Sequence, residues 1–128
     1  MNKILIVDDE ALLLQCLDKA LKTDDTEVTT AETGRAALTQ IADTCYQLCF
    51  LDVFLPDIDG VEVLKRIRDM SPRTKVIMMT AGIMTSNMKE IIEKNAYQFL
   101  PKPFDLLQIK MLARRALEKS LSESSPDN

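Results

Sequence analysis

Three short stretches of this chain are almost continuously apolar, and each stops at a polar residue. They are residues 3–7, 47–51 and 75–79. Runs of this length and composition are typical of strands that are buried on both faces of a sheet. Residues 27–31, which are rich in Val and Thr, and residues 97–100 predict two further strands.

Apolar residues recur at helical spacing between these strands. Leu13, Leu14, Leu17 and Leu21 predict a helix over residues 11–22. Four further helices are predicted: residues 35–42, the stretch between Gly60 and Ser71, residues 86–94, and from Asp105 to about Leu121. Thr33 and Asp105 are the expected N-caps of two of them. The last helix is expected to turn four residues inward: Leu106, Ile109, Ala113 and Leu117.

Strands that alternate with helices predict an α/β fold, in which one parallel sheet carries helices on both faces. No internal repeat and no boundary divides the pattern, so residues 1–121 are expected to form one domain. Residues 122–128 are rich in Ser, Asp and Glu and are expected to be a disordered tail or the start of a linker.

Composition narrows the classes of function. The net charge of −4 and the pI near 4.8 argue against direct binding of nucleic acid or of an anionic membrane. No apolar run approaches the length of a membrane span, and the start of the chain lacks a signal-peptide pattern, so a cytoplasmic location is expected.

The chain has three cysteines and no histidine. An odd number of cysteines is expected to give reduced thiols, and we predict that Cys16, Cys45 and Cys49 are small buried hydrophobic residues. Cys45 and Cys49 lack a second ligand pair, so a zinc site is not expected. The absence of histidine excludes Ser-His-Asp and Cys-His catalysis, histidine-ligated metals and a phosphohistidine role.

Polar residues follow four of the predicted strands: Asp8 and Asp9, then Asp52, then Thr80, then Lys102. Ligands of open parallel sheets bind beyond the carboxyl ends of the strands, so these side chains are expected to meet at one edge. Carboxylates about 4 Å apart repel by about 4 kcal/mol at an effective dielectric constant near 20. The cluster therefore predicts a bound cation, and its few oxygen ligands suit Mg²⁺.

A Mg²⁺ ion would let a phosphoryl group approach this edge. Asp52 could then act as an oxygen nucleophile and become an aspartyl phosphate. The Thr80 hydroxyl, the Ala81 N–H and the Lys102 ammonium would face the phosphoryl oxygens.

Four motifs carry a resemblance to a known family. They are V-D-D-E at residues 7–10, L-D-V-F-L-P-D-I-D-G at 51–60, M-T-A-G at 79–82 and F-L-P-K-P-F at 99–104. Together they resemble the receiver domain of bacterial two-component response regulators, over residues 3–120. The resemblance implies a flavodoxin-like strand order 2-1-3-4-5. The last strand would then lie at an edge, where Pro101 is tolerated.

The resemblance also implies roles for single residues. Asp52 would accept the phosphoryl group from a sensor histidine kinase or a histidine phosphotransfer protein. Asp9, Asp52 and the Phe54 carbonyl would hold Mg²⁺ directly, and Asp8 would act largely through water. Thr80, Ala81 and Lys102 would contact the phosphoryl group, and the Lys102–Pro103 bond would be cis.

A switch is implied as well. Thr80 would move towards the phosphoryl group, and Phe99 would rotate into the vacated space. The face of the fourth helix, last strand and last helix would then control an effector protein or a C-terminal output domain. A homodimer through the last helix stays open.

Three residues depart from the family pattern. Asn95 stands where a Gly is common, and it tolerates the left-handed conformation expected at such a helix end. Phe54 and Gly82 flank the expected path of a hydrolytic water, and neither side chain can orient that water. We therefore hypothesise a comparatively long-lived aspartyl phosphate.

Plainer interpretations and other functions remain open. Glu10 is interpreted mainly as part of an acidic first helical turn, and the basic groups at residues 65–68 and 114–115 are assigned no specific role. A Mg²⁺-dependent phosphohydrolase would need an acid two residues after Asp52, where Phe54 stands. A flavin-binding electron carrier would need a loop rich in Ser, Thr and Gly after the first strand.

Overall fold

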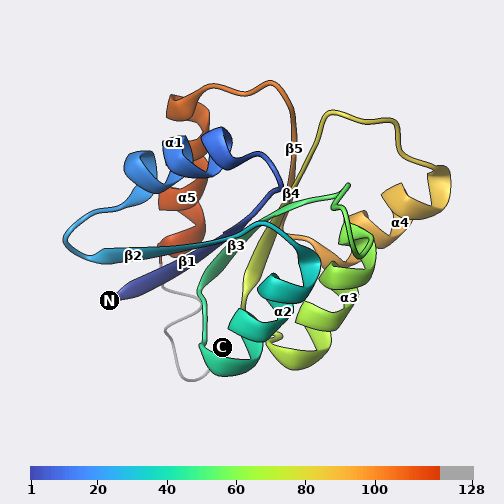
Figure 1. The fold of residues 1–128 in the computed structure, drawn as a ribbon, viewed down its shortest axis with the longest axis horizontal. Helices are drawn as coiled ribbons and strands as arrows, with labels where there is room; N and C mark the ends of the chain where they lie inside the picture. The colour runs from blue at the N-terminus through green and yellow to red at the C-terminus, as the bar shows by residue number, and fades with distance from the viewer. Residues whose placement is uncertain (119–128) are drawn as a thin grey trace.

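The computed structural model describes residues 1–118, in which five strands alternate with five helices (Figure 1). The strands are β1 (Asn2–Val7), β2 (Thr26–Ala31), β3 (Leu48–Asp52), β4 (Lys75–Thr80) and β5 (Gln98–Pro101). The helices are α1 (Ala11–Leu21), α2 (Gly34–Asp43), α3 (Gly60–Met70), α4 (Ser86–Asn95) and α5 (Leu106–Leu117). All four strand pairings are parallel, in the order β2-β1-β3-β4-β5. The predicted fold class and strand order are therefore confirmed.

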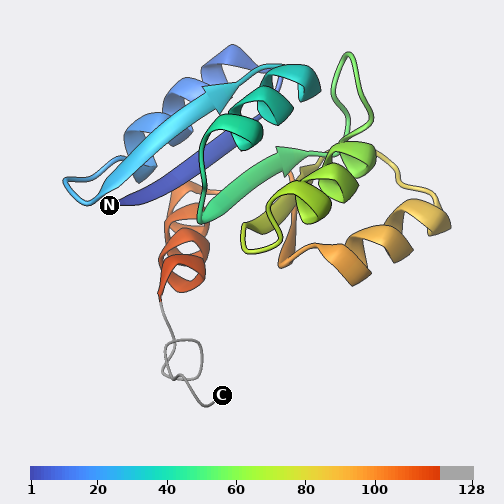
Figure 2. The same cartoon turned by 90° about the horizontal axis from the view of Figure 1, so that it is seen from below.

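The sheet separates two hydrophobic cores, because successive side chains of a strand point to opposite faces. Leu5, Leu51 and Met78 belong to the core beneath α2, α3 and α4. Ile6 and Phe50 belong to the core beneath α1 and α5. Figures 1 and 2 show these two layers of helices on either side of the sheet. Burial on both faces explains why the central strands read as unbroken apolar runs.

Helix α5 differs from the prediction at both ends. Its buried stripe is Ile109, Ala113 and Ala116, whereas Leu106 in the first turn is 45 % exposed. The helix ends at Leu117, because Glu118 already has an extended backbone. The predicted continuation to about Leu121 is thus wrong at Glu118, and residues 119–121 and the predicted tail lie outside the described residues.

The cysteines also correct an expectation. All three are free, as predicted, and Cys49 is buried in β3. Burial raises the pKa of the Cys49 thiol. Cys16 and Cys45 are exposed, because Cys16 lies off the buried stripe of α1 and Cys45 lies in the loop between α2 and β3.

The loop after β3 is tied to the start of α2. The two Asp57 carboxylate oxygens accept hydrogen bonds from the Gly34 and Arg35 N–H groups, at 2.8 and 2.9 Å. The Thr33 hydroxyl accepts from the Ala36 N–H, which confirms Thr33 as the N-cap. Desolvation raises the pKa of Asp57, but backbone N–H groups, with those of Arg35 and Gly34 foremost, together outweigh it and hold the pKa below the ordinary value. A carboxylate from another loop therefore completes this helix start.

None of the helices in the described part of the chain is long and apolar enough to cross a bilayer.

We predict that Asp57→Ala lowers the urea midpoint of unfolding at pH 7. A carboxyl group with a lowered native pKa stabilises the fold above its unfolded pKa, which is about 3.9. That contribution is lost as the pH falls through the native pKa, so the midpoints of the wild type and variant should converge below about pH 4. Asp24→Ala, in the exposed loop before β2, is the matched control. A gap between the wild-type and Asp57→Ala midpoints that is unchanged by pH would contradict this role.

Candidate functional site

The carboxyl ends of β1, β3, β4 and β5 meet at one edge of the sheet. Asp8 follows β1, Asp52 and Thr80 end β3 and β4, and Lys102 follows β5. Neighbouring strand ends are joined by the Val53 N–H to the Met79 carbonyl at 2.9 Å and by the Lys102 N–H to the Thr80 carbonyl at 2.8 Å. Parallel pairing therefore gathers side chains that are far apart in the sequence, as predicted.

The Lys102 ammonium lies among three carboxylates. Its Nζ is 2.7 Å from Asp8 Oδ2, 3.2 Å from Glu10 Oε1 and 3.3 Å from Asp52 Oδ2. Asp8 is fully buried and Asp52 is 5 % exposed, so Lys102 supplies the positive charge that these buried anions require. Burial alone would lower the pKa of Lys102, but its hydrogen bond to Asp8 and the charges of Asp52 and Asp8 raise it overall.

Glu10 is the member of this cluster that the sequence analysis missed. It stands at the N-cap position of α1, but its side chain makes no capping hydrogen bond. Its carboxylate reaches Lys102 instead. An acidic first turn was the plainer interpretation, and only the position of Lys102 in the fold distinguishes the two.

Asp52 is held in an environment that disfavours its charge. Burial raises the pKa of Asp52, and the nearby Asp8 carboxylate raises it further. The Phe54 N–H, which donates to Asp52 Oδ1 at 3.1 Å, and Lys102 act in the opposite direction. The net direction is upward, so a cation at this edge would favour the ionised carboxylate.

Three carboxylates are arranged as a cation site could be. One oxygen each of Asp8, Asp9 and Asp52 lies within 4.8 Å of the others. Asp8 and Asp52 are buried and Asp9 is exposed, so the site opens to solvent on one side. Oxygen-only donors, few in number and at the protein surface, fit Mg²⁺, which retains several of its waters. Phe54, whose carbonyl is the fourth predicted ligand, follows in the loop after β3.

The other predicted residues border the carboxylate cluster. Thr80 is buried, and its hydroxyl accepts a hydrogen bond from the Gly82 N–H at 2.9 Å. Ala81 lies on the exposed segment after β4 and lines a cavity of about 340 Å³ together with Lys102 and Glu10. The Phe54 ring, 44 % exposed, lies so close to Gly82 that a Cβ on Gly82 would collide with it.

Phe99 and Asn95 lie away from the carboxylates. Phe99, in β5, is partly buried and packs on the core beneath α2, α3 and α4. Asn95 is the last residue of α4, and its side-chain amide donates to the Ile91 carbonyl. No residue from 1 to 118 has a positive φ, so the left-handed conformation expected at Asn95 is wrong. The helix ends through an extended Ala96 instead. The predicted cis Lys102–Pro103 bond is confirmed.

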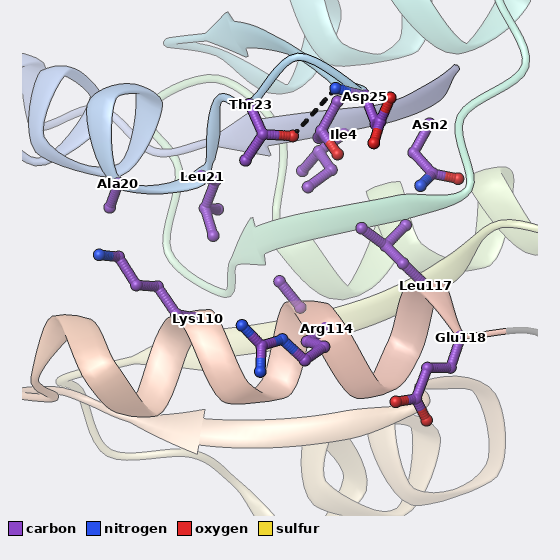
Figure 3. A pocket seen from close by; sticks show the side chains of 12 residues that line it. Asn2, Ile4, Ala20, Leu21, Thr23, Asp25, Lys110, Arg114, Leu117 and Glu118 are labelled. Carbon is purple, nitrogen blue, oxygen red and sulfur yellow. Dashed lines mark hydrogen bonds between the residues drawn. The ribbon is translucent and has the colours of Figure 1, made fainter.

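A cavity of about 530 Å³ lies at the other end of the molecule, between α1, α5 and the starts of β1 and β2 (Figure 3). Ile4, Leu21 and Leu117 supply apolar walls, and Lys110 and Arg114 line it from α5. None of the predicted site residues lines it, so it does not contribute to the carboxylate cluster.

Comparison with known proteins gives consistent matches. The model of the family described as "Response regulator receiver domain" matches residues 4–114. Regulatory protein AtoC of Escherichia coli is 36 % identical over 118 residues, which are 92 % of this chain and 26 % of AtoC. Transcriptional regulatory protein SrrA of Staphylococcus aureus is 33 % identical over 129 residues, 98 % of this chain and 53 % of SrrA. This chain thus spans about a quarter to a half of these relatives.

A solved structure agrees with these matches. Response regulator protein TrrA of Thermotoga maritima, determined in complex with Mg²⁺-BeF, has a TM-score of 0.79 and 31 % identity. The similarity covers 91 % of this chain and all of TrrA.

We predict that Lys102→Met raises the pKa of Asp52 above its wild-type value in the absence of divalent ions. The variant removes the cation beside Asp52 while the Asp8 charge remains, so the protonated form of Asp52 is stabilised relative to the ionised form. The carboxyl ¹³C chemical shift of Asp52, followed against pH, measures this. Lys65→Met, on the solvent side of α3, is the control and should leave the Asp52 titration unchanged. An unchanged titration in Lys102→Met would mean that Lys102 does not govern the charge of Asp52.

Proposed function

Because this chain belongs to the response regulator receiver domain family, we propose that it is a switch in which Asp52 takes a phosphoryl group from a sensor histidine kinase or a histidine phosphotransfer protein. The observation that carries this proposal is the meeting of Asp52, Lys102 and Thr80 beside two further aspartates at one sheet edge. A receiver domain is a signalling switch rather than an ordinary enzyme.

The proposed transfer would use groups at the same sheet edge as Asp52, of which Lys102 already contacts its carboxylate. A carboxylate oxygen of Asp52 attacks phosphorus, and the bond from phosphorus to the donor's leaving atom breaks as the new P–O bond forms. The Lys102 ammonium, now shared by three carboxylates, would turn to a phosphoryl oxygen. The Thr80 hydroxyl and the Ala81 N–H would donate hydrogen bonds to the others.

Mg²⁺ is the proposed cofactor. Asp9, Asp52 and the Phe54 carbonyl would hold it directly, and Asp8 largely through water. The ion would neutralise the charges of the aspartates and the phosphoryl group as they approach. Without it, the acidic residues repel the incoming anion.

The proposed output is a change in the face formed by α4, β5 and α5. Thr80 would move towards the phosphoryl group, and Phe99, already packed on the core under α4, would rotate. The phosphorylated form shifts an existing equilibrium by its different stability in the two states. The reader of this face would be an effector protein or a C-terminal output domain, since AtoC and SrrA are longer than this chain. A cytoplasmic location belongs to the same proposal, and homodimerisation through α5 stays open.

The alternative functions have less support. A phosphohydrolase would need an acid where Phe54 stands, and the Phe54 ring covers Gly82 instead. A flavin phosphate would meet Asp8, Asp9 and Glu10 after β1, where three negative charges would repel it.

Acetyl phosphate and Mg²⁺ test the proposed phosphorylation. We expect labelling to approach about one phosphoryl group per chain and to stop there, because the product stays on Asp52. Chelation of Mg²⁺ and the Asp52→Asn substitution should each abolish it, as measured by intact-protein mass spectrometry. Asp59→Asn, in the loop between β3 and α3, is the matched control. Many turnovers of acetyl phosphate per minute would support the hydrolase, and labelling that survives in Asp52→Asn would refute the assignment.

The lifetime of the phosphoryl group tests the role of Phe54. In Phe54→Asn a polar side chain can orient a water towards the phosphoryl group. One hydrogen bond gained in the transition state, worth about 1 kcal/mol, predicts about fivefold faster loss of label. Loss of ³²P after removal of the donor measures it.

Gly82 needs a paired control in this experiment. Gly82→Glu adds a polar group but also displaces the Phe54 ring, and Gly82→Ala displaces the ring alone. Faster decay in Gly82→Glu than in Gly82→Ala would assign the effect to the polar group. If neither Phe54→Asn nor Gly82→Glu accelerates decay, the two residues do not protect the phosphoryl group.

A further inference from the structure

Four cationic residues line one cavity far from the carboxylate cluster. Arg68 from α3, Arg73 from the loop after it, Lys75 from the start of β4 and Lys94 from α4 line a cavity of about 330 Å³, here called the basic pocket. No acidic residue lines it, although the whole chain has a net charge of −4. The pocket lies where β4 and β5 begin, whereas Asp52 and Thr80 lie where strands end.

The wall of the basic pocket is fixed by buried hydrogen bonds. Thr74 is fully buried, and its hydroxyl donates to the Tyr46 carbonyl at 2.7 Å. Arg68 Nη1 donates to the Thr74 carbonyl at 3.2 Å, which places one guanidinium at the wall. Lys75 Nζ donates to the Ala116 carbonyl at 3.0 Å and lies 5.1 Å from the centre of the Tyr97 ring. Arg68 is therefore held at the pocket wall, whereas the Lys75 ammonium is directed to α5.

The other two cations lack an acidic partner. Arg73 and Lys94 are exposed and form no ion pair with any acidic residue between positions 1 and 118. By contrast, Lys65 and Arg66 on α3 both pair with Glu62. Arg73 and Lys94 thus have no acidic partner among residues 1–118, and an anion that enters the pocket would lower their electrostatic free energy.

We propose that the basic pocket binds a small anion with a pyrophosphate group, free or as part of a nucleoside diphosphate. Planar guanidinium groups match phosphate oxygens in pairs, and ammonium groups add point charges. The Tyr97 ring, 40 % exposed and at the pocket wall, gives a surface on which a nucleobase can stack. The volume is that of a small-molecule site. A docked protein would need about 800 Å² of surface on each side, far more than this cavity offers.

Titration of the whole chain with pyrophosphate tests the proposal, with EDTA present to remove Mg²⁺. Without a divalent ion the aspartates repel phosphates, so pyrophosphate binding at the carboxylate cluster does not compete with binding at the basic pocket. We expect pyrophosphate to shift the NMR amide signals of Arg73, Lys75 and Tyr97. Arg73→Gln/Lys94→Gln should weaken binding at least about tenfold, through loss of two charged contacts. Arg35→Gln/Lys89→Gln, which removes two exposed cations elsewhere, is the matched control.

Two further ligands separate the free anion from the nucleotide. ADP that binds more tightly than pyrophosphate, with the gain lost in Tyr97→Ser, would identify a nucleotide site. Equal binding of ADP and pyrophosphate that is unaffected by Tyr97→Ser would identify a site for the anion alone. The absence of amide shifts at the pocket, or equal weakening in the pocket and control variants, would mean adventitious anion association only and would overturn the proposal. Labelling of Asp52 by acetyl phosphate is measured separately, and its failure would not bear on the pocket.

Discussion

The bonds of Lys102 to buried carboxylates are the interaction on which this structure depends. Asp8 is fully buried, and an isolated charge in that position would be prohibitively unstable. The Lys102 ammonium offsets it at 2.7 Å and also reaches Asp52 and Glu10. That single cation joins the ends of three strands, β1, β3 and β5, which the chain visits at widely separated positions. The same contact stabilises the acidic edge and keeps a positive charge beside Asp52.

Much of this arrangement could be predicted from the sequence because the pattern is local. An apolar run that ends at Asp52 predicts a buried strand with a charged group at its carboxyl end. Four strands that end in this way predict one shared edge of the sheet. The errors arise where the outcome depends on tertiary position. The helical pattern could not show that Glu118 leaves the helix, or that Leu106 lies outside the buried stripe. Cys16 and Cys45 could not be placed by composition, since cysteine is usually buried.

The site residues divide in the same way, into those that a local motif places and those whose partner is distant in the sequence. Motifs placed Asp9, Asp52, Thr80 and Lys102 in one region, because each closes a strand or follows one. Glu10 and Asp57 each depend on a partner that the sequence does not place beside them. Glu10 meets Lys102 across the sheet, and Asp57 meets the N–H groups of Gly34 and Arg35 from another loop. When a carboxylate caps a helix that is distant in the sequence, the residues around that carboxylate do not predict the contact.

Strand β4 has a mechanical consequence. Thr80 at one end of this strand borders the acidic edge, and Lys75 at the other end holds the Ala116 carbonyl in the last turn of α5. Strand β4 therefore links the acidic edge to the last turn of α5. An axial displacement of β4 by a fraction of a residue would pull directly on the Ala116 carbonyl through Lys75, without any helix having to repack.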